Sequence, residues 1–413
     1  MQMISALVKI RPLINNTRMR YPYLIGTALW IGWLSSLLLG SGNVDVAGQL
    51  VGTDFVAFYT AGKILLMDRS SDLYDLELAH QIQQPLYNRP SENFYFFLNP
   101  PFYAWLFVPF ALLPYPWSPI LWMTANLGFL GLSVRLLGVE KPLPVILLVL
   151  TWQPAFAAIS FGQNSFLSLM VLCLTYALWR KGNFFFAGLA AGMLLYKPHL
   201  LLGIGLLWFL EIRRNWRALA GLGASAVFLG GLSFALMPEA TLKYITFIQK
   251  IASNLMTVEG FPIWNAHSVQ AFWLALFPGA KVQAQWLYIL CSAVGVWLFV
   301  NLIRTVREVN LVQFGAAICL TIWITPSIFI YDWVLLLIPA IIFWRETAEQ
   351  RQFLTVIYAI LWAALFVSSA LTFVQWNTFG RAIQISIPIL AFSLVTTRHA
   401  ILTAFFNKQA NAG

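Results

Sequence analysis

Residues 353–374 read FLTVIYAILWAALFVSSALTFV, an apolar run without a charged side chain. At about 1.5 Å of rise per residue, a helix of this length is roughly 33 Å long and crosses the hydrocarbon core of a bilayer. Similar runs recur along the chain, which is 60% hydrophobic and 10% charged, against roughly 25% charged in soluble domains. The ~10-residue alternating segments of a transmembrane β-barrel are absent. We therefore predict an all-α polytopic membrane protein.

The apolar runs predict about twelve spans within a single integral membrane domain over residues 1–413. Their ranges are 23–39, 100–114, 117–137, 143–160, 163–179, 184–210, 217–236, 283–303, 310–327, 332–344, 353–374 and 380–397. Basic loops after the sixth, eighth and tenth spans favour a cytoplasmic N-terminus. Residues 40–99 and 237–282 then form two periplasmic loops. The region 135–183 fits less well, because Arg135, Lys141, Arg180 and Lys181 would lie outside, and a re-entrant segment there would change the count.

The net charge of +10 comes from basic residues scattered through these loops. Orientation in the membrane explains such a pattern, so we predict no nucleic-acid partner. The three cysteines lie within apolar runs and do not have the spacing of metal ligands. The sequence therefore predicts neither a disulfide nor a metal site. There is no Walker loop, no Gly-x-Ser-x-Gly and no HExxH motif, and therefore no sequence support for ATP use or zinc hydrolysis.

The first periplasmic loop carries seven of the fifteen acidic residues of the chain. Within this loop, the spacing of the apolar side chains in residues 54–67 (DFVAFYTAGKILLM) predicts an amphipathic helix on the membrane surface. In the second loop, residues 243–256 predict a weaker amphipathic helix. Asp54 stands at the start of the first helix. It is either an N-cap or a carboxylate that takes a proton from a substrate hydroxyl.

Lys197 lies inside the apolar run 184–210, where a charge costs roughly 2.5–3.5 kcal/mol at a helix centre. Pro198 disfavours helical geometry at Lys197, which predicts a break in the helix. At such a break the ammonium either contacts a phosphate or snorkels to an interface. His199 is a weaker candidate phosphate ligand beside it.

Several other polar residues have two interpretations each. Asp332, after Tyr331, either orients a basic partner or caps a helix. His267 either hydrogen-bonds a phosphate or sugar or is an incidental loop histidine. Gln163 and Asn164 are predicted to pair across helices. Asp72 and Asp75 are predicted to be turn and cap residues rather than metal ligands.

Taken together, several segments resemble the opening and middle of glycosyltransferase family 87. They are Asp54-Phe-Val-Ala-Phe-Tyr-Thr-Ala-Gly-Lys63, Leu73-Tyr-Asp75, Asn99-Pro-Pro-Phe-Tyr103, Leu112-Leu-Pro114, Gly162-Gln-Asn164, Gly188-Leu-Ala-Ala-Gly192, Tyr196-Lys-Pro198, Thr325-Pro and Tyr331-Asp-Trp-Val-Leu335. These segments keep the order of the family and cover most of the chain from about 50 to 340.

The resemblance implies a GT-C fold and an inverting transferase at the outer face of the bacterial inner membrane. Its donor would be a polyprenyl-phosphate-linked sugar, typically mannose, and its acceptor a lipid or glycan. It implies Asp54 as the catalytic aspartate and Lys197 as a phosphate contact. A His-containing motif of some members is replaced here by Tyr331-Asp332, which suggests a different acceptor.

The chemistry of such a reaction agrees with these assignments. Inversion takes one displacement and one carboxylate, and a cation such as Lys197 meets the leaving phosphate, so we expect no metal and no cofactor. A lipid or sugar transporter or flippase is the alternative function, and a membrane scaffold is a third. Transporters usually show inverted repeats and midplane charges, whereas the acidic residues here cluster in one loop.

Overall fold

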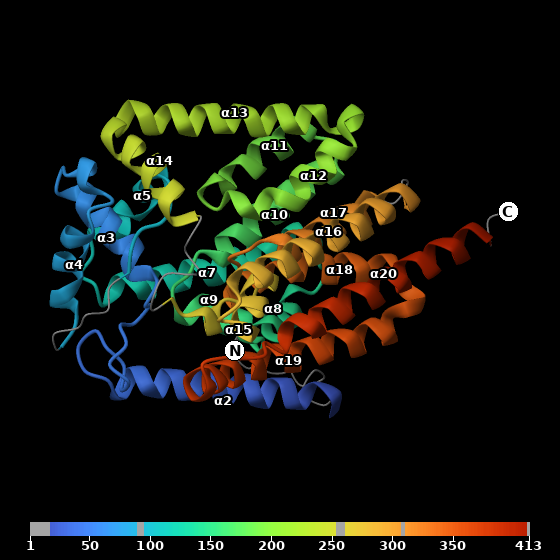
Figure 1. Cartoon of the computed structure of the whole chain (residues 1–413), viewed down its shortest axis with the longest axis horizontal. Helices are drawn as coiled ribbons and strands as arrows, with labels where there is room; N and C mark the ends of the chain where they lie inside the picture. Colours follow the sequence, from blue (N-terminus) through green and yellow to red (C-terminus); the bar gives the residue numbers. More distant parts are fainter. Residues whose placement is uncertain (1–16, 89–94, 253–260, 307–309, 411–413) are drawn as a thin grey trace, which may run out of the picture. The chain divides into compact units, whose positions relative to one another are not determined.

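The computed structural model describes residues 17–88, 95–252, 261–306 and 310–410. Regular secondary structure in these ranges is helical throughout, with isolated β-bridges at Ser41–Val44, Val44–Leu50 and Ala266–Phe329 (Figure 1). The chain divides into two compact units, Met1–Met170 with Ala226–Ser253 (unit 1) and Val171–Ser225 with Asn254–Gly413 (unit 2). The prediction of a single membrane domain over residues 1–413 stays a prediction.

Unit 1 contains the helices that surround the first long loop. They are α2 (Thr17–Leu39), α3 (Phe55–Leu66), η1 (Ser70–Asp72), α4 (Leu76–Gln83), η2 (Gln84–Leu86), α5 (Pro101–Ala104), η3 (Trp105–Phe107), α6 (Val108–Ala111), α7 (Trp117–Leu136), α8 (Pro142–Leu150), α9 (Gln153–Ser160) and α14 (Pro238–Ala252). Two further helices, α10 (Ser165–Arg180) and α13 (Ile212–Leu236), each have residues in both units.

Unit 2 contains the remaining helices. They are α11 (Phe184–Gly192), η4 (Met193–Tyr196), η5 (Pro198–Leu201), α12 (Leu202–Leu210), η7 (Ile263–Asn265), α15 (Val269–Leu276), α16 (Lys281–Thr305), α17 (Asn310–Ile324), η8 (Ile330–Leu336), α18 (Leu337–Glu346), η9 (Ala348–Gln350), α19 (Arg351–Phe379) and α20 (Ser386–Ala410).

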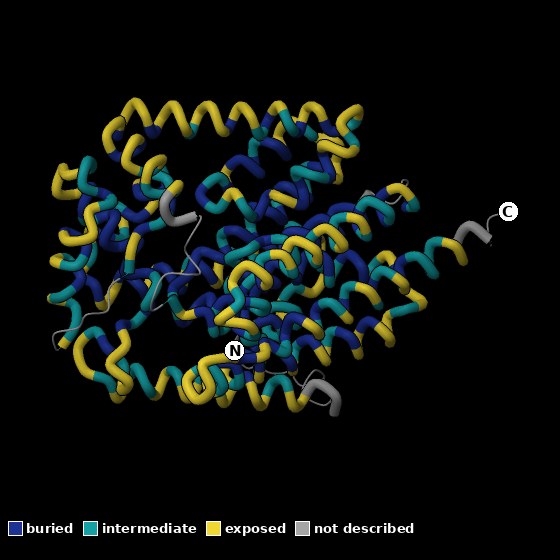
Figure 2. Tube along the Cα trace, in the orientation of Figure 1, coloured by how far each residue is buried: buried dark blue, intermediate teal, exposed yellow. Residues whose placement is uncertain are grey.

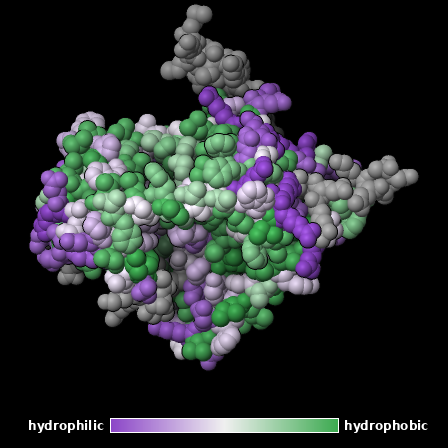
Figure 3. All heavy atoms as spheres, turned by 90° about the horizontal axis from the view of Figure 1, so that it is seen from above, coloured by the Kyte–Doolittle hydropathy of each residue, from purple (hydrophilic) through white to green (hydrophobic). Residues whose placement is uncertain are grey.

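Several helices have the length and composition of membrane spans. Among the described residues, five qualify, Arg20–Leu39, Ile212–Leu236, Lys281–Thr305, Ala348–Phe379 and Ser386–Asn407, and α8 with α9 would add a sixth. Their outward side chains are apolar: Val227 and Phe228 of α13 are 78% and 67% exposed (Figure 2). Figure 3 shows apolar side chains over much of one face of the molecule. Because exposed apolar surface on this scale requires lipid, the protein is a polytopic membrane protein.

The helix predicted after Asp54 is present as α3, but it is not an amphipathic surface helix. Ten of its twelve residues are buried, on every side of the helix. Gly62 allows α3 to approach α6 closely, since a Cβ there would lie 2.7 Å from the carbonyl oxygen of Phe107. The rings of Phe58 and Phe107 stack at 4.6 Å. The prediction of a surface position is therefore wrong, because neighbouring helices cover the polar face as well.

The run 100–114 does not cross a membrane as predicted. It forms α5, η3 and α6, and it begins and ends against the same long loop. At its start, Tyr74 donates its hydroxyl to the carbonyl of Asn99 (2.7 Å). At its end, Tyr115 donates its hydroxyl to the carbonyl of Val51 (2.9 Å). The prediction of a span here is wrong: the sequence is apolar because it packs along α3.

Consequently α7 starts beside the first long loop and runs away from it. Near its start, Trp122 donates Nε1–H to the carbonyl of Gly162 (2.9 Å), and Arg135 lies about 20 Å further along the helix axis. The chain returns through α8 and α9, which are bent by 79°, to the loop after α9. Arg135 and Lys141 therefore lie at the end of these helices remote from Asp54.

The run 184–210 is a helical hairpin rather than a single broken span. The predicted break is confirmed, because Lys197 has φ −134° and ψ 67° between η4 and η5. The guanidinium of Arg214, just after α12, lies 5.7 Å from the ring of Phe184 at the start of α11 and 5.1 Å from the ring of Trp179. Both ends of the run are thus together, and Lys197 is at its tip.

The second long loop contains the predicted weaker helix as α14. Its described part ends at Ala252, so the last residues of the predicted stretch, 253–256, lie outside the described residues. Lys243 donates Nζ–H to the carbonyl of Ser71 (2.7 Å), and Tyr244 packs on Tyr74 with ring centroids 5.6 Å apart. The two predicted periplasmic loops therefore meet within unit 1.

Candidate functional site

Asp54 holds the N-cap position of α3 without acting as a side-chain cap. Within the described structure its carboxylate makes no capping hydrogen bond to α3. Instead, Gln163 donates Nε2–H to Asp54 Oδ2 at 2.7 Å. The backbone is fixed separately, because the N–H groups of Asp54 and Phe55 both donate to the carbonyl of Phe161 (2.9 and 3.1 Å). The half-buried carboxylate is therefore aimed away from its own helix.

The turn that carries Gln163 follows α9. Gly162 has φ +68°, and a Cβ there would lie 2.6 Å from Cβ of Phe55, so only glycine fits. Trp122 fixes this turn through its bond to the carbonyl of Gly162 and packs on Phe55 with ring centroids 6.1 Å apart. Asn164 donates Nδ2–H to the hydroxyl of Tyr103 (3.0 Å). Gln163 and Asn164 thus pair across helices, with different partners.

Tyr95 is a neighbour of Asp54 that sequence reasoning missed. Burial raises the pKa of Tyr95 above its usual value, and the charge of Asp54 raises it further, so the two groups lie within electrostatic range. The buried amide of Gln83 fixes the backbone of Tyr95 through bonds of 2.8 and 2.9 Å. Tyr95 does not stand out in a sequence with many aromatic residues. The one signal that could have pointed to it is its partner Gln83, which is a polar residue on an apolar helix face.

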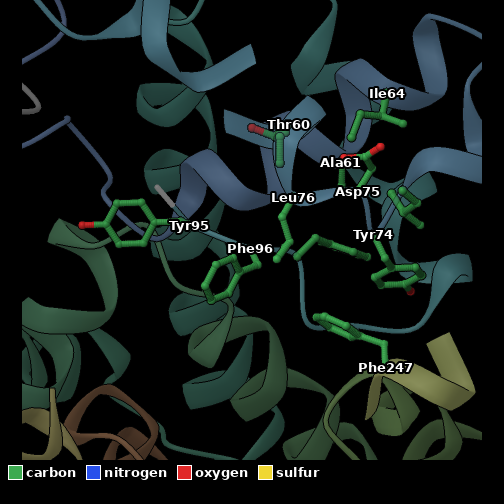
Figure 4. A pocket seen from close by; sticks show the side chains of 12 residues that line it. Thr60, Ala61, Ile64, Tyr74, Asp75, Leu76, Tyr95, Phe96 and Phe247 are labelled. Atoms are coloured by element: carbon green, nitrogen blue, oxygen red, sulfur yellow. The ribbon is translucent and has the colours of Figure 1, made fainter. Parts of the chain in front are cut away.

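Tyr95 also borders a small cavity between α3, α4 and α14. The cavity has a volume of about 10 Å³ and is lined by Thr60, Tyr74, Asp75 and Phe247, among others (Figure 4). It has room for about one water and not for a sugar. In Figure 4 the hydroxyl of Tyr95 points away from the other labelled side chains.

A larger cavity of about 500 Å³ lies between α7 and α8. Its lining is apolar apart from Arg135 and includes Gly128, Leu132 and Leu143. The lining residues from α7 belong to the half of that helix that is remote from Trp122 and Asp54, and Leu143 belongs to the start of α8. The cavity therefore does not adjoin the carboxylate of Asp54.

In unit 2, Lys197 at the tip of the hairpin pairs with Asp332. Lys197 Nζ donates to Asp332 Oδ1 at 2.9 Å, and the two side chains are 12% and 3% exposed. The same ammonium lies 5.3 Å from the centre of the Tyr331 ring. The ammonium is therefore paired with a buried carboxylate rather than left to water. Asp332 orients this lysine.

His199 lies two residues beyond Lys197, in the same tip. Its Nε2 is shielded from solvent and has no hydrogen-bond partner among the described residues. Its carbonyl accepts a long hydrogen bond from the hydroxyl of Thr325 (3.5 Å). An unpartnered polar nitrogen in a shielded position normally meets a ligand or water. Lys197, His199, Tyr331 and Asp332 thus form one cluster.

His267 is not available to a substrate in this structure. It is fully buried, its Nδ1 lies 2.9 Å from Ser386 Oγ and its Nε2 lies 3.0 Å from Ser369 Oγ. Burial lowers the pKa of His267 to about 3, so the ring is neutral. Its carbonyl accepts from Trp333 Nε1 (3.0 Å). The residue fastens the second long loop to α19 and α20.

The remaining predicted acids have local roles. Asp75 caps α4 by accepting from the N–H groups of Glu77 and Leu78 (2.9 and 3.1 Å). Asp72 pairs with Nε of Arg69 at 2.7 Å. Both agree with the prediction of turn and cap residues. The candidate residues therefore form two groups, Asp54 with Gln163 in unit 1 and the Lys197 cluster in unit 2.

Comparison with known proteins gives one match. The profile of glycosyltransferase family 87 matches residues 97–327, more than half of the chain. The matched range includes Gln163, Asn164, Lys197, His199 and His267, whereas Asp54, Tyr331 and Asp332 lie outside it. Neither the curated proteins nor the solved structures contain a match. The extent of this match shows that the chain belongs to glycosyltransferase family 87.

Proposed function

We propose that the protein is an inverting glycosyltransferase of the GT-C type with about twelve spans. It would move a hexose such as mannose from a polyprenyl-phosphate donor to a lipid or glycan acceptor at the outer face of the bacterial inner membrane. The observation that carries the proposal is the carboxylate of Asp54, which Gln163 holds at 2.7 Å and which does not cap its helix. A helix cap would explain Asp54 without function, and that explanation no longer applies.

In the proposed reaction, Asp54 is the general base. The acceptor hydroxyl attacks the anomeric carbon as its proton passes to the carboxylate of Asp54, and the bond from the anomeric carbon to the phosphate oxygen breaks. One displacement inverts the configuration. The polyprenyl phosphate leaves as an anion and needs a cation rather than a general acid.

Lys197 and His199 are the proposed contacts of the donor phosphate. The ammonium of Lys197 carries three N–H donors, and its bond to Asp332 uses one of them. Nε2 of His199 has no partner among the described residues and is a further polar contact for the phosphate. Because the ammonium of Lys197 takes the place of a metal ion at the phosphate in this proposal, we expect transfer to persist in EDTA. Loss of activity in EDTA that Mg²⁺ or Mn²⁺ restores would contradict this.

Asp332, Tyr331 and Asn164 are proposed to act by holding these groups, and His267 by fixing the second loop. A polar acceptor would approach Asp54 from the first loop, where Tyr95 also lies. The orientation of the site toward the periplasm is supported by the charges of unit 1. Arg135 and Lys141 lie at the end of the helices remote from Asp54, and the positive-inside rule places that end in the cytoplasm.

The test is sugar transfer by the purified protein. Polyprenyl-phosphate mannose with a radiolabelled sugar is incubated with the protein and with lipid and glycan fractions from a deletion strain, in which the acceptor accumulates. A labelled product of inverted anomeric configuration supports the proposal. No product from any fraction, in a preparation that is folded, would contradict it.

A lipid or sugar transporter is the second candidate function. The observation in its favour is the buried pair of Lys197 and Asp332, since intramembrane ion pairs also mark transport pathways. The same labelled donor in proteoliposomes separates the two. Movement of the intact donor across the bilayer, without transfer to an acceptor, favours the transporter.

A further inference from the structure

The carboxylate of Asp54 and the amide of Gln163 belong to segments 109 positions apart, yet they meet at 2.7 Å. The amide is buried, with Gln163 only 8% exposed. An ionised carboxylate has only acceptors, so the amide must turn its nitrogen toward Asp54. We propose that Gln163 is the positioning residue of the base, and this inference rests on the proposed function of Asp54.

The hydrogen bond from the amide of Gln163 goes to Oδ2 of Asp54. An amide donor stabilises the charged form of a carboxylate without adding a charge of its own. Gln163 thus favours the ionised carboxylate, which is the form that a general base needs.

The position of Gln163 is fixed by the turn in which it lies. Gly162 packs on Phe55 so closely that a Cβ would lie 2.6 Å from Cβ of that residue. The carbonyl of Phe161 accepts both N–H groups at the start of α3. Donor and carboxylate therefore belong to one rigid assembly, in which the side chain of Gln163 has little freedom to leave Asp54.

Replacing Gln163 by methionine removes the donor and keeps the length of the side chain. We expect Q163M to lower kcat about 10- to 100-fold, the range expected for a hydrogen bond to a charged group. The donor KM should stay unchanged because the phosphate cluster is untouched. The acidic limb of the pH–rate profile should move up by about 1 to 2 pH units, since Asp54 then gains a proton more readily.

Q163N separates the presence of an amide from its reach. It keeps the donor but is one methylene shorter, so it should behave like Q163M rather than like the wild type. The matched control is Q313M, which removes a buried glutamine donor to the carbonyl of Val306 in unit 2. A merely structural role of Gln163 predicts similar effects for Q163M and Q313M, with no shift of the pH profile.

The protonation of Asp54 is also measured without the reaction. A carbodiimide modifies protonated carboxyl groups, and mass spectrometry reports labelling of Asp54 in membranes as a function of pH. We expect the midpoint to rise in Q163M and to stay unchanged in Q313M. An unchanged midpoint and pH profile in Q163M would overturn the inference, and so would a Q163M protein that fails to fold, which would make Gln163 a structural residue.

The outcomes keep this inference distinct from the proposed function. If the wild type transfers sugar and Asp54→Asn does not, while Q163M matches the wild type, Gln163 is not the positioning residue and the transferase remains. If the wild type transfers no sugar, the proposed function fails. The labelling midpoint then still reports whether Gln163 controls the carboxyl group of Asp54.

Discussion

Lys197 and Asp332 form a buried ion pair of 2.9 Å, although 135 positions separate them in the chain. The pair joins the tip of the hairpin formed by α11 and α12 to the helical turn η8. Its ammonium also faces the ring of Tyr331. The ammonium of Lys197 is thus held by a carboxylate and an aromatic ring from the same segment, residues 331–332.

Lys197→Met should affect stability and function separately. Removing one partner of a buried pair leaves the other charge uncompensated and costs about 3–5 kcal/mol. The double variant Lys197→Met/Asp332→Leu removes both charges and should regain most of that stability. It should still use the donor poorly, with a raised KM. Thermal unfolding in detergent and transfer kinetics measure both effects. A double variant with normal donor KM would exclude Lys197 from phosphate binding.

Asp54→Asn should lower turnover by at least ~10²-fold with little loss of stability. The side-chain oxygen of the asparagine can still accept from Gln163, and no cap is lost because Asp54 makes no capping bond in the described structure. Asp75→Asn is the matched control, since asparagine also caps α4 and the capping role of Asp75 accounts for its carboxylate. Equal activity of the two variants would move the base elsewhere.

The sidedness of the basic residues gives a topological prediction. Cysteines replace Ser70, Arg135 or Lys181 one at a time, in a protein without its native Cys173, Cys291 and Cys319. An impermeant maleimide should label position 70 in intact cells, and positions 135 and 181 only after the inner membrane is permeabilised. Labelling of position 135 in intact cells would place that end of α7 outside and contradict the proposed orientation.

His267 should make the folded protein sensitive to acid. Its pKa is about 3 in the folded state, against about 6.5 in an unfolded chain. Between these values the unfolded chain binds a proton that the folded chain excludes, so stability falls as the pH falls from 6.5 toward 3. The slope is at most about 1.4 kcal/mol per pH unit. His267→Gln should flatten it, as measured by unfolding at several pH values, and an unchanged slope would contradict this origin.

The sequence predicted which segments are helical more reliably than how those helices pack and connect. Apolar runs identify helices such as α13, α16 and α19 because lipid demands continuous apolar length. Two runs were misinterpreted. The run 100–114 packs along α3, and the run 184–210 is a helical hairpin whose two ends lie together. As a result, Arg180 and Lys181 lie at the same end of the helices as Arg214.

The candidate site could be predicted in part for a similar reason. Asp54 and Lys197 stand out because charges are rare in apolar surroundings, and Pro198 marks the break beside Lys197. Their partners could not be predicted, because no local pattern links Asp54 to Gln163 or Lys197 to Asp332. Tyr95 was missed because an aromatic residue in a membrane protein is ordinarily a packing residue.

The distances along the chain between these partners also set an order of events in biosynthesis. Asp54 leaves the ribosome 109 residues before Gln163, and Lys197 leaves it 135 residues before Asp332. At about 5–20 residues per second, each charge waits roughly 5 to 27 s for its partner. During that time a newly inserted carboxylate and ammonium lack their final contacts. The contacts of Asp54 with Gln163 and of Lys197 with Asp332 can form only after the later segment of each pair has been synthesised.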